Sequence, residues 1–204
     1  MIDNLTVITL NQPGIKDFAR ARNEAMAKAK TDWVLFVDSD ETVTPQLEAE
    51  IKQAIKEKSF NYQLRRQDYL QGRILKFGET AAVRLIRLIQ PESGRWQGKV
   101  HEVFVSKLPV KTLSRPLVHR RDINFAQLFE RLNYYSDLRA KELFDQGVKF
   151  SFGQLFLPKL KFIHNYFIRL GFLDGVPGLM MAALMSFHSL MVRVKLYVYW
   201  QKTK

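Results

Sequence analysis

Residues 33–37 form an unbroken apolar run, Trp-Val-Leu-Phe-Val, and the acidic sequence Asp-Ser-Asp-Glu follows at once at 38–41. A short, continuous apolar run between polar residues is typical of a strand buried on both faces of a sheet. Such a strand carries whatever follows it to the carboxyl edge of the sheet, where open α/β sheets bind their ligands. The run therefore predicts both a core strand and a candidate site.

Helical and strand-like patterns alternate around this run. Residues 5–10 are rich in β-branched side chains, and residues 17–30 carry apolar side chains at helical spacing. After the acidic sequence, Thr44 and Pro45 are suited to the first positions of a second helix. Alternating strands and helices predict an α/β fold.

The remainder of the chain divides into a strand-like part and a helical part. Residues 61–118 are strand-like, residues 124–146 predict a helix with Gly147 as its cap, and further helical stretches follow. We therefore expect a mixed, Rossmann-like sheet with flanking helices over residues 1–120, followed by an α-helical region over residues 121–204.

Charge is unevenly distributed along the chain, whose formal net charge is +12. Residues 1–60 have a net charge of −2, whereas residues 147–204 have a net charge of +7 and hold 11 of the 25 aromatic residues. Cationic, aromatic and apolar residues together favour a surface that meets an anionic membrane. A packed helical subdomain with a solvated basic face is the alternative. No motif for reading nucleic acid accompanies the charge, so nucleic acid is not an expected partner.

Residues 175–192 contain no charged side chain, but they include a proline, two glycines and three polar residues. A helix that spans a bilayer needs about 20 apolar residues. An interfacial, re-entrant or buried core helix is therefore favoured over a full span.

The chain contains no cysteine, which excludes disulfides, thiolate metal sites and a cysteine nucleophile. Its first residues lack the basic and apolar regions of a secretion signal, so a cytoplasmic location is expected.

Asp38 and Asp40 are the candidate metal ligands. Two carboxylates this close are costly to keep ionised without a partner, and Mg²⁺ or Mn²⁺ prefers carboxylate and phosphate oxygens. A pair of acids in a turn also commonly caps a helix or faces water, so the pair alone is weak evidence.

Five motifs in order resemble family 2 glycosyltransferases of the GT-A fold, and in particular bacterial lipopolysaccharide-core or capsule glucosyltransferases. They are FARARN at 18–23, DWVLFVDSDE at 32–41, RLIR at 84–87, WQGKVHE at 96–102 and GFLDG at 171–175. The resemblance implies a partial GT-A fold and a hexosyltransferase. Its donor would be a nucleotide diphosphosugar, such as a uridine diphosphosugar, and its acceptor lipid-linked or part of a lipopolysaccharide or capsule. The reaction would invert the anomeric carbon, depend on Mg²⁺ or Mn²⁺, and take place at the inner face of the cytoplasmic membrane.

The resemblance also assigns roles to residues. Glu102 would be the general base, and Asp40 would hold the metal with Asp38 near the metal or the ribose. His101 would contact the metal or the diphosphate. A surface pair on an edge strand is the alternative for residues 101–102.

Three further residues would bind the donor: Arg22, Asn23 and Arg84. Arg22 is the candidate partner of a phosphate or a carboxylate, with an i,i+4 ion pair on a solvated face as the alternative. Arg84 and Arg87 lie three residues apart on an expected strand and point to opposite faces. Only one of them can face the diphosphate, and Arg84 is the preferred one.

Compared with the family pattern, residues 5–10 are expected to correspond to the third strand, and the first βαβ unit, which grips the nucleoside in the family, is expected to be missing. A catalytically inactive, membrane-associated module is therefore the alternative function.

Overall fold

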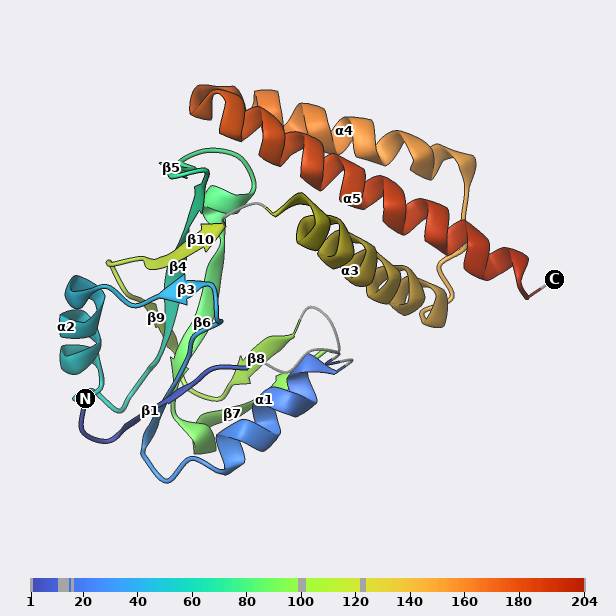
Figure 1. Ribbon diagram of the computed structural model, residues 1–204. Helices are drawn as coiled ribbons and strands as arrows, with labels where there is room; N and C mark the ends of the chain where they lie inside the picture. Colours follow the sequence, from blue (N-terminus) through green and yellow to red (C-terminus); the bar gives the residue numbers. More distant parts are fainter. Residues whose placement is uncertain (1, 11–14, 16, 99–101, 122–123, 204) are drawn as a thin grey trace. The chain divides into compact units, whose positions relative to one another are not determined.

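The computed structural model describes residues 2–10, 15, 17–98, 102–121 and 124–203. The chain divides into two compact units (Figure 1). The first comprises Met1–Tyr69 and Ala82–Arg121, and the second comprises Leu70–Ala81 and Asp122–Lys204. The segment Leu70–Ala81, expected within the first part, groups with the helical second unit.

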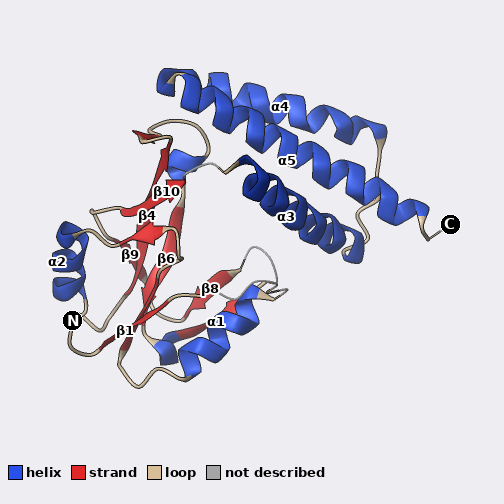
Figure 2. Cartoon of the chain, viewed as in Figure 1, coloured by secondary structure: helices blue, strands red, loops and turns tan. Residues whose placement is uncertain are grey.

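The first unit is a mixed sheet with flanking helices α1 (Phe18–Ala27) and α2 (Pro45–Ala54) (Figure 2). Its strand order is β1-β2-β6-β4-β10-β3, and β9 also pairs with β4. Strands β1 and β2 are parallel, whereas β6 runs antiparallel to both β2 and β4. Strands β7 and β8 form a separate antiparallel pair. The strands are β1 (Leu5–Ile8), β2 (Trp33–Phe36), β3 (Glu41–Thr42), β4 (Asn61–Leu70), β6 (Arg84–Ile89), β7 (Gly94–Gln97), β8 (Val103–Ser106), β9 (Val110–Thr112) and β10 (Leu117–Arg121).

Strand β2 is buried on both faces, as its apolar run predicts. Trp33 and Leu35 pack in one cluster with Leu47 and Ile51 of α2. The alternate side chains of β2 pack in a second cluster with α1 and β7. Because a fully buried side chain of this size contributes about 1.5–3 kcal/mol, β2 anchors both layers.

The two helices begin where the sequence predicts. Thr44 caps α2 by accepting the N–H of Leu47 at 3.2 Å, and Pro45 occupies the first turn. Asp17 caps α1 by accepting the N–H of Arg20 at 2.9 Å. These caps satisfy N–H groups that have no partner within the helix.

In the second unit, α5 packs against both α3 and α4. The core between α3 and α5 is formed by Ala140, Leu143, Val192 and Leu196. By length and composition, α5 could cross a membrane. The elements of this unit are β5 (Arg73–Ile74), α3 (Phe125–Asp145), η3 (Phe152–Phe156), α4 (Leu157–Ile163), the π-helical η4 (His164–Ile168), η5 (Gly171–Asp174) and α5 (Val176–Gln201). Of the two remaining short helices, η1 (Thr80–Ala82) ends at the boundary between the units and η2 (Pro91–Ser93) lies in the first unit.

The predicted α/β class with a mixed sheet, flanking helices and a helical C-terminal segment is confirmed.

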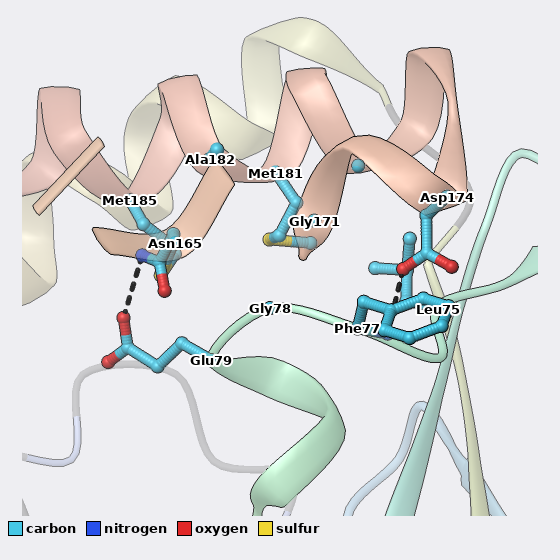
Figure 3. A pocket seen from close by; sticks show the side chains of 11 residues that line it. Leu75, Phe77, Gly78, Glu79, Asn165, Gly171, Asp174, Met181, Ala182 and Met185 are labelled. Atoms are coloured by element: carbon cyan, nitrogen blue, oxygen red, sulfur yellow. Dashed lines mark hydrogen bonds between the residues drawn. The ribbon is translucent and has the colours of Figure 1, made fainter. Parts of the chain in front are cut away.

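Hydrogen bonds to Asp174 and Asn165 tie the segment Leu70–Ala81 to the helices of the second unit (Figure 3). The carboxylate of Asp174 accepts the backbone N–H groups of Lys76 and Phe77 at 3.0 and 2.9 Å. The side chain of Asn165 donates to Glu79 at 3.1 Å. Asp174, within the motif at 171–175, therefore has a structural role.

The glycines of this region permit close packing of η5 against α5. A Cβ atom on Gly178 would lie 2.0 Å from the carbonyl oxygen of Gly171, which is far inside contact distance. The cavity beside them has a volume of about 10 Å³. A cavity of this size holds at most one water molecule.

Candidate active site

The acidic sequence after β2 forms a tight turn that leads into β3. The N–H of Glu41 donates to the carbonyl oxygen of Asp38 at 2.9 Å, and the carboxylate of Glu41 accepts the N–H of Asp38 at 2.9 Å. These reciprocal bonds hold the turn closed and bury Glu41. Burial raises the pKa of the Glu41 carboxyl group above its usual range.

Two buried arginines bind the carboxylate of Asp38. Arg87 of β6 lies 2.5 Å from Oδ2, and Arg22 of α1 lies 3.2 Å from Oδ1. Burial raises the pKa of the Asp38 carboxyl group, but Arg87 and Arg22 together lower it by more, so the pKa lies below its usual range. Burial in turn lowers the pKa of the Arg87 guanidinium, and Asp38 and Glu41 raise it above its usual value. Asp38 is therefore an ionised carboxylate that forms ion pairs with both Arg22 and Arg87.

Arg22 joins the turn after β2 to Glu102. Its Nε donates to Oε1 of Glu102 at 2.9 Å, while its Nη2 faces Asp38. The guanidinium packs against the rings of Phe36 and Trp96, at 5.0 and 4.9 Å from the ring centroids. Its side chain is only 5% exposed, which excludes the alternative of an i,i+4 pair on a solvated face.

Arg22 and Arg87 each retain an N–H group without a partner. Nη1 of Arg22 and Nε of Arg87 are buried and have no hydrogen-bond acceptor within the described part of the chain. An unsatisfied buried donor of a charged group is costly. Each is therefore an unsatisfied donor within the cluster around Asp38.

His119 of β10 links Asp40 to the buried Asp68 of β4. Its Nε2 lies 3.1 Å from Oδ2 of Asp40, and its Nδ1 contacts Oδ1 of Asp68. Arg66 lies 3.3 Å from the same Asp68 oxygen. His119 is buried, so it has a structural position within the sheet.

Neither His119 nor Asp68 was a candidate from the sequence. Position 119 carries no ligand spacing to another histidine, and position 68 lies within a run of polar residues. The pairing of β10 with β3, which sets His119 opposite Glu41, brings His119 beside the acidic turn. Only the sheet register supplies this information.

Two predicted donor-binding residues lie in different surroundings from Arg22. The side chain of Asn23 bonds both backbone groups of Trp96 at 2.9 Å, so it fastens α1 to β7. Arg84 is exposed and donates to the carbonyl oxygen of Ala82, whereas Arg87 joins the cluster around Asp38. A donor-binding role for Asn23 and Arg84 stays a prediction, and His101 lies outside the described residues.

Among the described residues of this site, Asp40 is the one that suits a divalent cation. Both oxygens of Asp38 are committed to guanidinium groups, whose positive charge opposes a metal ion. The Asp40 side chain is 32% exposed at the carboxyl end of β2. Among the described residues, no cluster of three or more acids or histidines is arranged to hold a metal. Since Mg²⁺ is commonly held by one or two carboxylates together with substrate phosphates, Asp40 fits this mode of binding.

Comparison with known families gives a match to the first half of the chain. The model of the family described as "Glycosyl transferase family 2" matches residues 2–105, which is half of the chain. The matched stretch contains Arg22, Asp38, Asp40, Arg87 and Glu102, and it ends before His119.

Proposed function

Because the match covers half of its residues, the chain belongs to glycosyl transferase family 2, and we propose that it transfers a hexose from a nucleotide diphosphosugar, with inversion, to a lipid-linked, lipopolysaccharide or capsule acceptor. Membership of the family supports glycosyltransferase activity with a nucleotide-sugar donor and an acceptor. The donor class, the acceptor class and the stereochemistry are the proposal.

One observation carries the proposal: Arg22 bonds Asp38 and Glu102 at the same time. These carboxylates are 64 positions apart in the sequence, yet one guanidinium spans them. A nucleotide-sugar transferase needs cationic donors for its diphosphate and a base for the acceptor hydroxyl within a few ångströms of each other. The Arg22 cluster supplies both kinds of group in one place.

In the proposed reaction, Glu102 takes the proton of the acceptor hydroxyl. The hydroxyl oxygen forms a bond to the anomeric carbon as the bond from that carbon to the diphosphate oxygen breaks. The electron pair of the broken bond leaves with the diphosphate. We propose that the unpaired N–H groups of Arg22 and Arg87 stabilise the negative charge that develops on this leaving group, with Arg87 in the role expected of Arg84.

A divalent cation, Mg²⁺ or Mn²⁺, is part of the proposal, with Asp40 as its protein ligand. When bound, such an ion neutralises charge on the departing diphosphate. His119 fixes the orientation of the Asp40 carboxylate, and Asp68 in turn holds His119. Asp38 then serves mainly to position Arg22 and Arg87.

We further propose a cytoplasmic enzyme that is peripheral to the inner face of the cytoplasmic membrane. The support is the net charge of +7 over residues 147–204 together with the apolar character of α5. A cationic and apolar region is attracted to anionic lipid. A lipid-linked acceptor is then presented at the same surface.

Calorimetry with a uridine diphosphosugar tests donor binding. We expect saturable binding in the presence of Mn²⁺ or Mg²⁺, and weaker binding after chelation. The variant Asp40→Asn should lose the metal dependence, whereas Asp32→Asn, at an exposed acid before β2, should retain it. Absence of binding under all metal conditions would contradict autonomous catalysis by this chain.

The role of Glu102 is tested by Glu102→Gln. We expect transfer to fall by about 10²–10⁴-fold, because a general base typically contributes that factor. Donor binding measured by calorimetry should persist. Glu24→Gln, which removes an exposed acid from α1, is the matched control. Unchanged turnover in Glu102→Gln would reject Glu102 as the base.

A catalytically inactive, glycosyltransferase-like membrane module is the second candidate function. The observation that favours it is that Asp38 and Glu102 are both already paired with guanidinium groups. This alternative predicts that the chain binds membranes but no nucleotide sugar.

A further inference from the structure

Helix α5 exposes one continuous apolar stripe. Every exposed side chain from position 176 to position 198 is apolar, and the members recur every three or four residues. That spacing places them on one side of the helix over about 33 Å, at 1.5 Å per residue. The members of this α5 stripe are Val176, Leu179, Ala183, Phe187, Leu190, Val194, Tyr197 and Val198.

The opposite side of α5 is buried within its own unit. Val192 and Leu196 pack against Ala140 and Leu143 of α3. At the polar margin of this interface, the hydroxyl of Tyr199 donates to Asp137 at 3.1 Å. We therefore expect α3 to stay packed against α5 when α5 meets a membrane.

Helix α3 exposes charge along its length. Because α3 is fastened to α5, a bilayer crossing by α5 would take these charges into hydrocarbon, where each is costly. Spanning is therefore disfavoured by the packing, although the length and composition of α5 permit it. The exposed charged residues of α3 are Glu130, Arg131, Asp137, Lys141 and Asp145.

The positive charge of residues 147–204 favours anionic lipid as the partner of the α5 stripe. Residues 147–204 contain eight lysines and arginines and a single acid, Asp174, whose carboxylate is bound by backbone N–H groups. A second copy of this chain would bring the same positive charge against itself. Anionic lipid headgroups complement it.

A second set of exposed apolar residues supports the same partner. It lies on η3, α4 and η4, where eight large apolar side chains are exposed. Exposed apolar surface on this scale is unusual for a monomer that meets only water. The most exposed members are Phe152, Phe156, Leu160, Phe167 and Ile168.

We propose that the second unit lies on an anionic lipid layer through the α5 stripe, with α5 parallel to the membrane plane and not across it. The inference deepens the peripheral location given under Proposed function. It does not depend on sugar transfer, so its tests use no activity measurement. They can fail while the proposed sugar transfer holds, and they can succeed while sugar transfer fails.

Vesicle co-sedimentation of the full chain tests the partner. We expect binding to phosphatidylcholine vesicles to strengthen by at least about ten-fold when phosphatidylglycerol is added, and to weaken in high salt. Val194→Glu should weaken binding by about ten-fold or more, since it places a charge in the stripe. Val105→Glu on β8 is the matched control, because Val105 is 49% exposed and Val194 is 47% exposed. Far-UV circular dichroism verifies that both variants fold.

Three outcomes of these experiments would overturn the proposal. The first is equal binding of wild type and Val194→Glu. The second is binding that ignores anionic lipid. The third is a dimer in sedimentation velocity that Val194→Glu dissociates while vesicle binding stays unchanged, which would assign the stripe to a second copy.

The absence of native cysteine allows the orientation to be measured with single labels. Environment-sensitive fluorophores are placed at Leu179→Cys, Leu190→Cys and Tyr197→Cys in the stripe, and at Lys141→Cys on α3. Quenching by brominated lipids should give the same shallow depth for the three stripe positions, while aqueous iodide still reaches position 141. A deep position 190 between shallow ends, with position 141 protected, would show that α5 spans the bilayer and would refute the parallel orientation.

Discussion

At the scale of single residues, the site depends on guanidinium groups that each serve two acids. Arg22 bonds Asp38 and Glu102, and Arg87 bonds Asp38 and Glu41. Buried charges are stable only when they are paired, and removal of one partner leaves the other uncompensated. The four ion pairs therefore hold the turn after β2 in one conformation and make it sensitive to substitution.

Replacement of Arg87 tests this dependence. We expect Arg87→Leu to lower the free energy of unfolding by about 3–5 kcal/mol, because it leaves Glu41 buried and deprives Asp38 of its shortest ion pair. Arg84→Leu on the same strand is the control, and it should change stability by no more than about 0.5 kcal/mol, since Arg84 is exposed. Urea denaturation at pH 7 measures both, and equal effects would mean that the pairs contribute little.

The pKa of Asp38 predicts a pH dependence. A carboxyl group whose pKa is lowered in the folded state stabilises the fold above its ordinary pKa of 3.8, and this stabilisation disappears as the pH falls through the folded value. We therefore expect Asp38→Asn to be less stable than wild type at pH 5–7, and the difference to shrink below pH 3.8. Urea midpoints at each pH measure it, and a difference that stays constant down to pH 3 would be inconsistent with the ion pairs.

The sequence predicts part of this site and misses the rest for a physical reason. Arg22, Asp38 and Glu102 lie in motifs that can be recognised locally, and the structure joins them through hydrogen bonds. His119 and Asp68 come from strands β10 and β4, whose neighbours are fixed by the sheet register. No local pattern encodes that register, so these residues could not be predicted.

At the scale of elements, local signals placed the helices and strands well where a cap or an apolar run marked them. Helix α3 ends as predicted, with Gly147 at a positive φ of 74°. The irregular stretch from η3 to η5 has no such periodicity, because its 3₁₀ and π-helical turns follow tertiary contacts. The association of Leu70–Ala81 with the helical unit depends on Asp174 and Asn165, nearly a hundred residues later.

The close approach of η5 to α5 gives a prediction at this scale. Gly178→Ala should destabilise the second unit by about 1–3 kcal/mol, since its Cβ would collide with the carbonyl oxygen of Gly171. Gly153→Ala should be neutral within about 0.5 kcal/mol, because nothing lies within 4 Å of its added Cβ. Helix unfolding followed by circular dichroism distinguishes the two variants, and an unperturbed Gly178→Ala would show that the packing there can relax.

At the scale of the whole molecule, two separate sets of apolar clusters belong to the two units. Domains that have their own cores commonly unfold in separate transitions. The tryptophans make this measurable, because Trp33 and Trp96 lie in the first unit and Trp200 lies in the second.

In a Trp200→Phe background, fluorescence therefore reports on the first unit, while far-UV circular dichroism is dominated by the long helices of the second. We expect Gly178→Ala to lower the midpoint seen by circular dichroism and to leave the fluorescence midpoint unchanged. Arg87→Leu should instead lower the fluorescence midpoint and leave the midpoint seen by circular dichroism unchanged. Coincident shifts of both signals in both variants would mean that the chain unfolds as one cooperative body.

The α5 stripe also has a consequence for how this protein behaves at the bench. Eight exposed apolar side chains in a row adsorb to apolar materials, so in plain buffer the protein should be lost to plastic and to chromatography resins. Mild detergent or a nanodisc supplies an alternative surface and should keep the protein in solution. Yield and homogeneity would then depend more on the choice of amphiphile than on salt or temperature.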